Sequence, residues 1–174
     1  MNKILFLILS AFLLNISISY AQKSKDTSSD NQFLLLSKKP YFKINFPAQY
    51  KLEDSKTEKG LKTMFYKAVY KNDVYLFKFT EHKNPAVSSD NKAYMNASLQ
   101  SFIDGINAEL IKKYDYKDKK GKGMEAFLTI PDKNLNVFYR VTIIKHVQYQ
   151  IIVITKSKDK TEEITNFFNS FTSK

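Results

Sequence analysis

The chain of 174 residues contains no cysteine and no tryptophan, has two histidines and four glycines, and carries a single arginine, Arg140. The lack of cysteine excludes disulfides, thiol nucleophiles and a lipid attached through a cysteine at a cleavage site. A serine nucleophile would need a histidine base, for which only His82 and His146 exist. The glycines form no phosphate-binding loop, and Gly121-Lys122-Gly123 indicates a flexible turn.

Each histidine has an ordinary explanation. His82 follows an expected strand, and His146 lies at an expected hairpin turn, where exposed imidazoles are common. Glu81 and His82 are neighbours on that strand and therefore point to opposite faces, so they do not easily bind one metal ion. We expect no catalytic residue, no metal site and no cofactor, and therefore a protein that is not an enzyme.

The N-terminal residues have the layout of a secretory signal peptide. A positive charge at Lys3 precedes an apolar run at Ile4–Leu14, and cleavage is expected between Ala21 and Gln22. The alternative, a membrane-spanning helix, needs about 20 consecutive apolar residues, and Asn15 interrupts the run earlier. We expect an exported protein, periplasmic or secreted, with no lipid anchor and no membrane span after cleavage.

The sequence predicts three parts: a signal peptide at residues 1–21, a mobile leader at 22–38 and a single domain at 39–174. The leader begins with polar residues that show no apolar period, which is typical of mobile chain. The apolar run FLLLS at its end is too short for its period to distinguish a strand from a helical turn. The roughly 150 residues left after cleavage are enough to bury one core without disulfides.

The formal net charge is +11, and nearly all of it comes from lysine. A basic balance favours nucleic acid, anionic lipid or acidic glycan as a partner, and export makes nucleic acid the least favoured of these. The alternative is compositional, because many lysines simply cover solvated faces.

The segment KKYDYKDKKGKG, residues 112–123, is strongly basic. Lys112 and Lys113 are expected at the end of a long helix, where they complement the negative end of its dipole. The alternative interpretation of the remaining lysines is an edge strand that is protected from aggregation. Part of KYDYKDKK, residues 113–120, is predicted to form a strand, and the candidate anion-binding residues on this strand and the loop after it are Lys117, Lys119, Lys120 and Lys122.

Apolar periodicity places the first elements. A strand with one buried face is predicted at residues 41–46, and two more at 61–70 and 74–81 flank a KND turn. Residues 51–60 are expected to form a charged loop. A long helix is predicted at 93–111, capped by Ser89 or Asp90, with one apolar stripe made of Leu99, Phe102, Ile103, Ile106 and Leu110.

The second half predicts a strand at 124–130, a hairpin at 136–155 and a final helix. The hairpin is apolar on both faces, so we expect it to be central and covered on both sides, with its turn at His146 and Val147. The helix is predicted to begin with a capping box of Asp159 and Glu162. It docks through Ile164, Phe167, Phe168 and Phe171. Together these elements predict an α+β fold, an antiparallel sheet of about six strands sandwiched by helices.

Arg140 lies in the middle of an expected strand among apolar neighbours. A guanidinium there needs a carboxylate or an anionic ligand, because an unpaired buried charge is strongly unfavourable. A structural ion pair and a ligand anchor both remain open, so Arg140 is a candidate binding residue.

Three segments carry a family resemblance: FKINFPAQY at 42–50, YRVTIIKHVQYQIIVIT at 139–155 and FFNSF at 167–171. In their order along the chain they resemble the PsbP-like superfamily. The resemblance implies an antiparallel sheet between helices that works as a binding or accessory module. We therefore expect an exported, non-catalytic module that acts on an envelope protein or on an anionic lipid or glycan. The alternative is a small-molecule carrier or a hydrolase with an unrecognised pocket.

Overall fold

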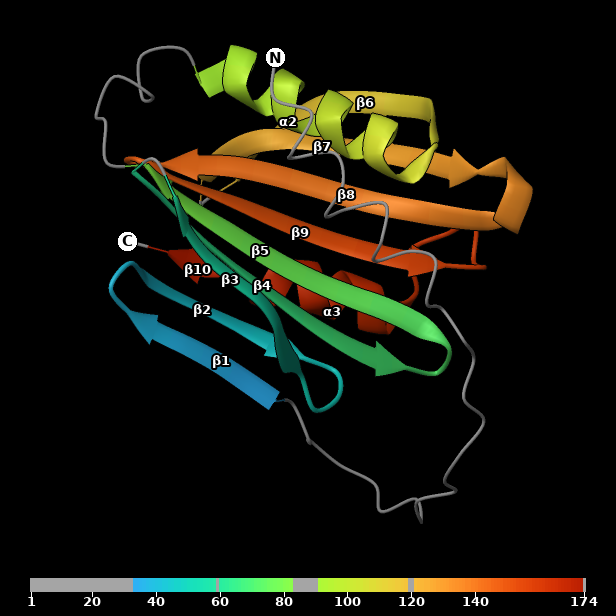
Figure 1. The fold of residues 1–174 in the computed structure, drawn as a ribbon. Coiled ribbons are helices and arrows are strands. Elements are labelled where there is room, and N and C mark those ends of the chain that lie inside the picture. The colour runs from blue at the N-terminus through green and yellow to red at the C-terminus, as the bar shows by residue number, and fades with distance from the viewer. Residues whose placement is uncertain (1–32, 59, 83–90, 119–120, 174) are drawn as a thin grey trace.

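The structure is a computed structural model that describes residues 33–58, 60–82, 91–118 and 121–173 (Figure 1). These residues form ten strands in two antiparallel sheets, two α-helices and one 3-10 helix. In chain order the elements are β1 (Phe33–Lys38), β2 (Tyr41–Phe46), β3 (Lys51–Glu58), β4 (Leu61–Tyr70), β5 (Asp73–His82), α2 (Asn91–Ile106), β6 (Glu109–Asp118), β7 (Gly121–Ile130), η2 (Pro131–Lys133), β8 (Leu135–Ile144), β9 (Val147–Thr155), α3 (Glu162–Ser170) and β10 (Thr172–Ser173).

The large sheet has seven strands in the order β3-β4-β5-β9-β8-β7-β6, and the small sheet has the order β1-β2-β10. The β8–β9 hairpin lies in the middle of the large sheet, as its two apolar faces predict. Its turn is formed by Lys145 and His146, one residue earlier than expected, because Ile144 is the partner of Val147. Lys145 has a positive φ of 57°. This change in the turn does not alter the alternation along either strand, so the two apolar faces of the hairpin hold the side chains that alternation assigns to them.

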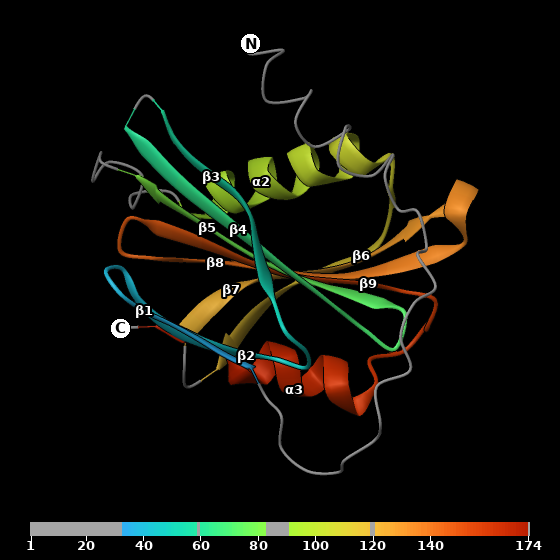
Figure 2. The same ribbon diagram turned by 60° about the horizontal axis from the view of Figure 1, so that its bottom comes forward.

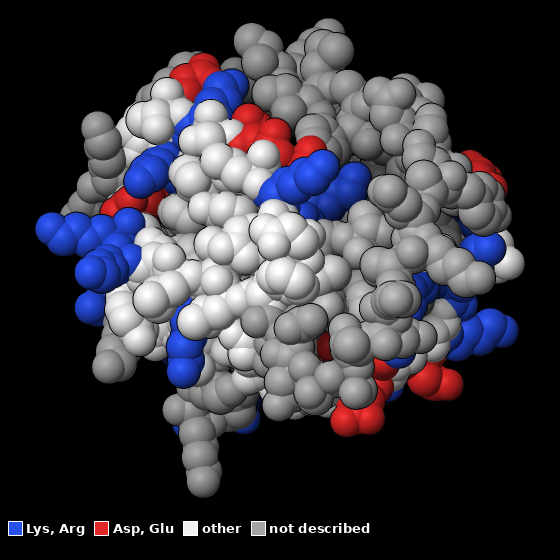
Figure 3. Space-filling model, turned by 90° about the horizontal axis from the view of Figure 1, so that it is seen from below, with Lys and Arg blue, Asp and Glu red and all other residues white. Residues whose placement is uncertain are grey.

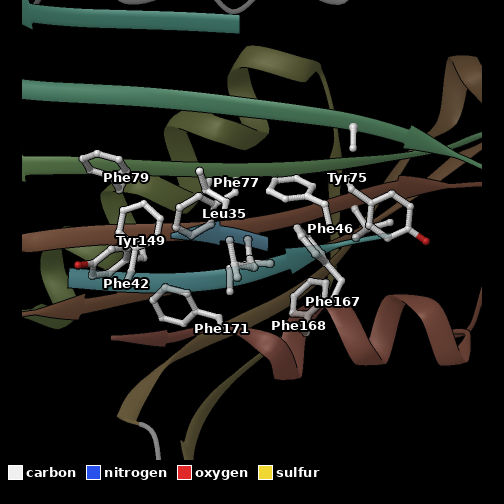
Figure 4. Packing of buried hydrophobic residues seen from close by; sticks show 14 of the residues in the cluster. Leu35, Phe42, Phe46, Tyr75, Phe77, Phe79, Tyr149, Phe167, Phe168 and Phe171 are labelled. Atoms are coloured by element: carbon white, nitrogen blue, oxygen red, sulfur yellow. The ribbon is translucent and has the colours of Figure 1, made fainter. Parts of the chain in front are cut away.

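Two layers cover the large sheet, one on each face (Figure 2). Helix α2 packs on one face, and the small sheet and α3 pack on the other. Strand alternation sends Tyr75, Phe77 and Phe79 of β5 towards the small sheet and α3, whereas Leu76 points towards α2. The large sheet thus has a hydrophobic core on each face. Figure 4 shows the core between the large sheet, the small sheet and α3, in which aromatic rings from β2, β5, β9 and α3 pack together.

The predicted fold class is wrong in two respects. The described residues contain ten strands rather than about six, and a three-stranded sheet provides much of the cover on one face that was assigned to helices. The extra strands were missed because β1 is short and β3 is highly charged, whereas β10 has only two residues. β1 also places ordered chain before residue 39, inside the segment expected as a leader.

The charged loop expected at 51–60 is instead the edge strand β3, whose outer neighbour is solvent and whose polar side chains therefore carry no apolar signal. The long helix ends at Ile106 rather than near residue 111. Asn107 adopts a positive φ of 53°, and the chain then turns into β6, where Leu110 lies. Asn residues tolerate this left-handed conformation and commonly end helices. The proposed cap residues Ser89 and Asp90 lie outside the described residues.

Helix α3 begins two residues later than predicted, so Asp159 is not its N-cap. Thr161 is the N-cap, and its hydroxyl accepts a hydrogen bond from the amide of Ile164 at 3.3 Å. The expected docking stripe is confirmed, because Ile164, Phe167 and Phe168 are all buried. Among the described residues no helix has the length and apolar character needed to cross a membrane.

Candidate functional site

The basic hairpin, defined here as the lysine-bearing part of β6 and β7 at residues 112–122, holds the predicted anion-binding lysines. Lys117 and Lys122 are directly opposite each other in the β6–β7 register, and both are exposed. Like charges in opposite positions of a strand pair destabilise it. The nearby carboxylate of Asp115 is 2.8 Å from Lys92 of α2. Lys119 and Lys120 lie outside the described residues.

Lys112 and Lys113 do not end a helix, so the dipole explanation for them is wrong. Both lie on β6. Lys113 donates to the side-chain oxygen of Asn96 at 3.0 Å, and the ammonium of Lys112 lies 5.6 Å from the centre of the Tyr114 ring. The described lysines of the segment, Lys112, Lys113, Lys117 and Lys122, therefore all belong to the β6–β7 strand pair.

Arg140 lies in a buried cluster centred on Glu125. Its Nε donates to Glu125 Oε1 at 2.7 Å, and Lys160 and Tyr114 reach Glu125 Oε2 at 2.8 and 2.5 Å. The side chains of Arg140 and Glu125 are only 12% and 7% exposed. The carboxylate partner that a buried guanidinium requires is thus supplied by the neighbouring strand β7.

Arg140 also holds the terminal helix. Its Nη1 donates to the backbone oxygen of Phe168 at 3.1 Å, and its guanidinium lies 5.2 Å from the Phe168 ring centre and 4.6 Å from that of Tyr116. These contacts come from β6, β7 and α3 together. Arg140 therefore connects the sheet to α3, and the protein itself supplies the acceptors for its guanidinium and the rings that it contacts.

The electrostatics of the cluster keep Glu125 ionised. Burial raises the pKa of Glu125, but hydrogen bonds from Lys160 and Tyr114 and the charge of Arg140 outweigh burial, so the pKa lies below its usual value. Burial, followed by the hydrogen bond to Glu125 and its charge, raises the pKa of Tyr114 to about 12. The cluster therefore places one carboxylate between two cations, Arg140 and Lys160, beside the neutral hydroxyl donor of Tyr114, and carries a net charge of +1.

Gly123 is a site residue that sequence reasoning assigned to a flexible turn. It lies inside β7, opposite Tyr116 of β6. A Cβ at this position would be 2.3 Å from the backbone oxygen of Val141 and 2.7 Å from the Tyr116 ring. Glycine lets Tyr116 lie close over the strand and reach Arg140. The available signal was a glycine within a strand pattern, which marks close backbone approach.

The two histidines lie at the same end of the large sheet. The amide of His82 donates to the backbone oxygen of His146 at 3.0 Å, and the His146 ring is 3.5 Å from the carboxylate of Glu81. Burial and the neighbouring His146 lower the pKa of His82. Within the part of the chain that the structure describes, no group of three or more His, Cys, Asp or Glu residues is placed to hold a metal ion.

Lys78 is a further residue that the sequence did not single out as a site. It lies on β5 between Phe65 and Gln150 of the flanking strands. Burial lowers its pKa, and the charge of Asp54 opposes that shift. Its amine therefore loses a proton more readily than those of the exposed lysines. The signal was a single lysine in a strand that is otherwise apolar on both faces.

A surface groove of about 420 Å³ runs between α2 and β6. Two of its polar side chains are bonded within or beside it: Asn96 accepts from Lys113, and Gln100 donates to Asp104 at 2.7 Å. Its floor is apolar and includes Leu99, which is 3% exposed. The lining residues are Asn96, Ala97, Leu99, Gln100, Ile103, Leu110 and Lys113.

Comparison with known proteins gives no assignment. No model of a protein family matches the chain, and no curated protein matches it. The geometry of the described residues therefore carries the functional argument.

Proposed function

We propose that this protein is an exported, non-catalytic binding module that acts on an anionic component of the cell envelope through its basic hairpin. The resemblance of its three hydrophobic motifs to the PsbP-like superfamily suggests an accessory role and forms part of this proposal. Export implies that the signal peptide is removed between Ala21 and Gln22. Intact-mass measurement of the exported protein checks this step, and a mass that includes Met1 would exclude it.

The observation that carries the proposal is the direct opposition of Lys117 and Lys122. Two exposed ammonium groups on facing strands repel each other, and an anion bound between them removes that repulsion. Tyr114 of the same strand points to the opposite face of the sheet, where its hydroxyl donates to Glu125, so the lysine pair itself forms the expected anion contact. Protection of a sheet edge would require lysines on the strand but not this pairing across the hairpin.

The test uses the mature protein and a soluble acidic polysaccharide as the anionic probe. Binding is expected to weaken steeply as salt rises, because the contacts are between charges. The variant in which Lys117, Lys119, Lys120 and Lys122 become Gln is expected to bind at least about tenfold more weakly, and its thermal midpoint is expected not to fall, because the repulsion between Lys117 and Lys122 is removed. Lys156→Gln/Lys158→Gln removes two exposed lysines elsewhere and is the matched control. Equal binding by the four-Gln variant and this control would reject the hairpin as the site.

The groove between α2 and β6 favours a second candidate function, carriage of a small molecule. Its volume falls within the range of ligand pockets, and its floor combines Leu99 with the partly buried Ile103. An environment-sensitive apolar dye is expected to gain fluorescence with the wild type and to lose it with Ile103→Asp. An unchanged signal in a folded Ile103→Asp variant would exclude the groove as a carrier site.

A further inference from the structure

The outward face of the small sheet exposes leucines where a solvent-facing sheet normally carries polar residues. In β1, Leu35 points inward and is 7% exposed, whereas Leu34 and Leu36 point outward and are 51% and 52% exposed. On the inward side, Leu35 belongs to the same core as Phe42 and Ile44 of β2, which are both fully buried. The core therefore explains one leucine of the run FLLLS and leaves the other two without a partner in the described structure.

A further exposed leucine lies on the neighbouring edge of the large sheet, where the charges are mixed. The hydroxyl of Tyr50 donates to the backbone oxygen of Leu34 at 3.4 Å, which connects the residue before β3 to β1. Leu52 on β3 is 50% exposed, but Glu53 and Asp54 follow it directly. We therefore call the surface formed by Leu34, Leu36 and the outward lysines of β1 and β2 the leucine face.

The charges on the small sheet have one sign. Lys43 of β2 is the direct partner of Leu36, and Lys38 ends β1 opposite Tyr41. Strands β1, β2 and β10 and the turn between the first two contain lysines but no Asp or Glu. Figure 3 shows the molecule from below: an area of uncharged side chains at the centre is bordered by Lys and Arg side chains, and at its upper margin also by Asp and Glu side chains.

We propose that the leucine face is a docking surface for an anionic lipid bilayer. Exposed leucines gain free energy only when they enter an apolar phase, and lysines at their margin contact the phosphates of the head groups. A soluble polyanion would engage the lysines and leave the leucines in water. Two copies stacked face to face would oppose Lys38 and Lys43 of one copy to the same residues of the other.

The leucine face is separate from the basic hairpin, because it is built by β1 and β2 of the small sheet and not by β6 and β7. Docking on lipid therefore does not depend on the proposed function of the hairpin. The two surfaces can be tested independently, with vesicles for the first and acidic polysaccharide for the second.

The first experiment measures binding of the mature protein to phosphatidylcholine vesicles with and without phosphatidylglycerol. Leu34→Ser/Leu36→Ser keeps the charge and is expected to weaken binding to the anionic vesicles about tenfold. Lys38→Gln/Lys43→Gln is expected to weaken it about fivefold or more for each lysine. The matched control is Leu61→Ser/Val69→Ser, because these residues are also exposed apolar side chains of a strand, β4. Binding of the leucine variant to acidic polysaccharide is expected to remain unchanged.

The second experiment uses the absence of tryptophan in the chain. Leu36→Trp creates a single tryptophan in the leucine face of the small sheet. Val69→Trp places the same reporter on β4, on the face of the large sheet that points away from the small sheet. Anionic vesicles are expected to shift the emission of Leu36→Trp to shorter wavelength, and quenchers attached to the acyl chains are expected to reduce it. Val69→Trp is expected to show neither effect.

Three results would overturn the inference. The first is vesicle binding by Leu34→Ser/Leu36→Ser that equals that of the wild type. The second is emission from Leu36→Trp that does not change with anionic vesicles. The third is a concentration-dependent dimer of the wild type that Leu34→Ser/Leu36→Ser abolishes, because the leucines would then be covered by a second copy.

Discussion

Replacing Glu125 with Gln tests whether the buried cluster holds α3 on the sheet. The substitution keeps the shape of the side chain and removes the negative charge that Arg140 and Lys160 share. The amide oxygen of Gln can still accept a hydrogen bond at one of the two carboxylate positions. At the other position the amide NH2, itself a donor, faces the donors that the second carboxylate oxygen accepted from. We therefore expect a large loss of stability with little change in packing.

The size of the loss follows from the burial of each partner. Removing one member of a buried ion pair costs about 3 to 5 kcal/mol. Lys160 is 29% exposed and can turn towards water, whereas Arg140 is 12% exposed and remains largely buried. The hydrogen bond from Arg140 to the Phe168 oxygen also remains. The expected cost is therefore about 3 kcal/mol, at the lower end of that range.

The pH dependence gives an independent check. The pKa of Glu125 is lower in the folded protein than its ordinary value of 4.5. The unfolded chain therefore takes up a proton first as pH falls, and the stability that Glu125 contributes is present above pH 4.5 and is lost as pH falls through the folded pKa. The free energy of unfolding of the wild type should decrease in this acid range, and that of Glu125→Gln should decrease less.

Urea denaturation at neutral pH measures the effect. A cost of about 3 kcal/mol lowers the midpoint by about 1 to 3 M. Glu163→Gln is the matched control, since Glu163 pairs with Lys71 at 2.6 Å on the exposed surface, and it should cost less than about 1 kcal/mol. A free energy of unfolding for Glu125→Gln within about 0.5 kcal/mol of wild type would refute the assignment of this cluster as the connection to α3.

Three further substitutions test the fold. Ile152→Asp should prevent folding, as seen by thermal denaturation, because the side chain is 2% exposed in the core under α2; an unchanged midpoint would contradict that packing. Gly123→Ala should cost about 1 to 3 kcal/mol in urea denaturation, because its Cβ would meet the Val141 oxygen at 2.3 Å; a neutral effect would show that β7 and β8 can separate there. Thr161→Ala should cost about 1 kcal/mol as the loss of a helix cap, whereas Thr165→Ala in the same helix should be nearly neutral, and equal effects would argue against the cap.

Much of the local structure could be predicted because its signals are periodic. The alternation in β2 and in the β8–β9 hairpin assigns each side chain to a face whatever the rest of the chain does. The stripe of Ile164, Phe167 and Phe168 likewise requires a docked helix. The lone Arg140 within an apolar strand required a carboxylate or an anionic ligand, since an unpaired buried guanidinium is too unfavourable.

Other features depend on contacts between distant residues, and local pattern does not contain them. Leu110 fits both a helical stripe and a strand, and the left-handed Asn107 decides between them. The sequence required a partner for Arg140, but only the alignment of β7 beside β8 identifies it as Glu125.

By itself, the sequence determined which segments must bury an apolar face and which buried charge needs compensation, because both follow from the transfer of single side chains out of water. The tertiary structure alone decided that β1 and β10 pair with β2, that Lys117 lies opposite Lys122 and that Leu34 and Leu36 remain exposed. These outcomes depend on strand register and on which surface finds a cover, and both are set by the free energy of the whole packed chain rather than by any short segment of it.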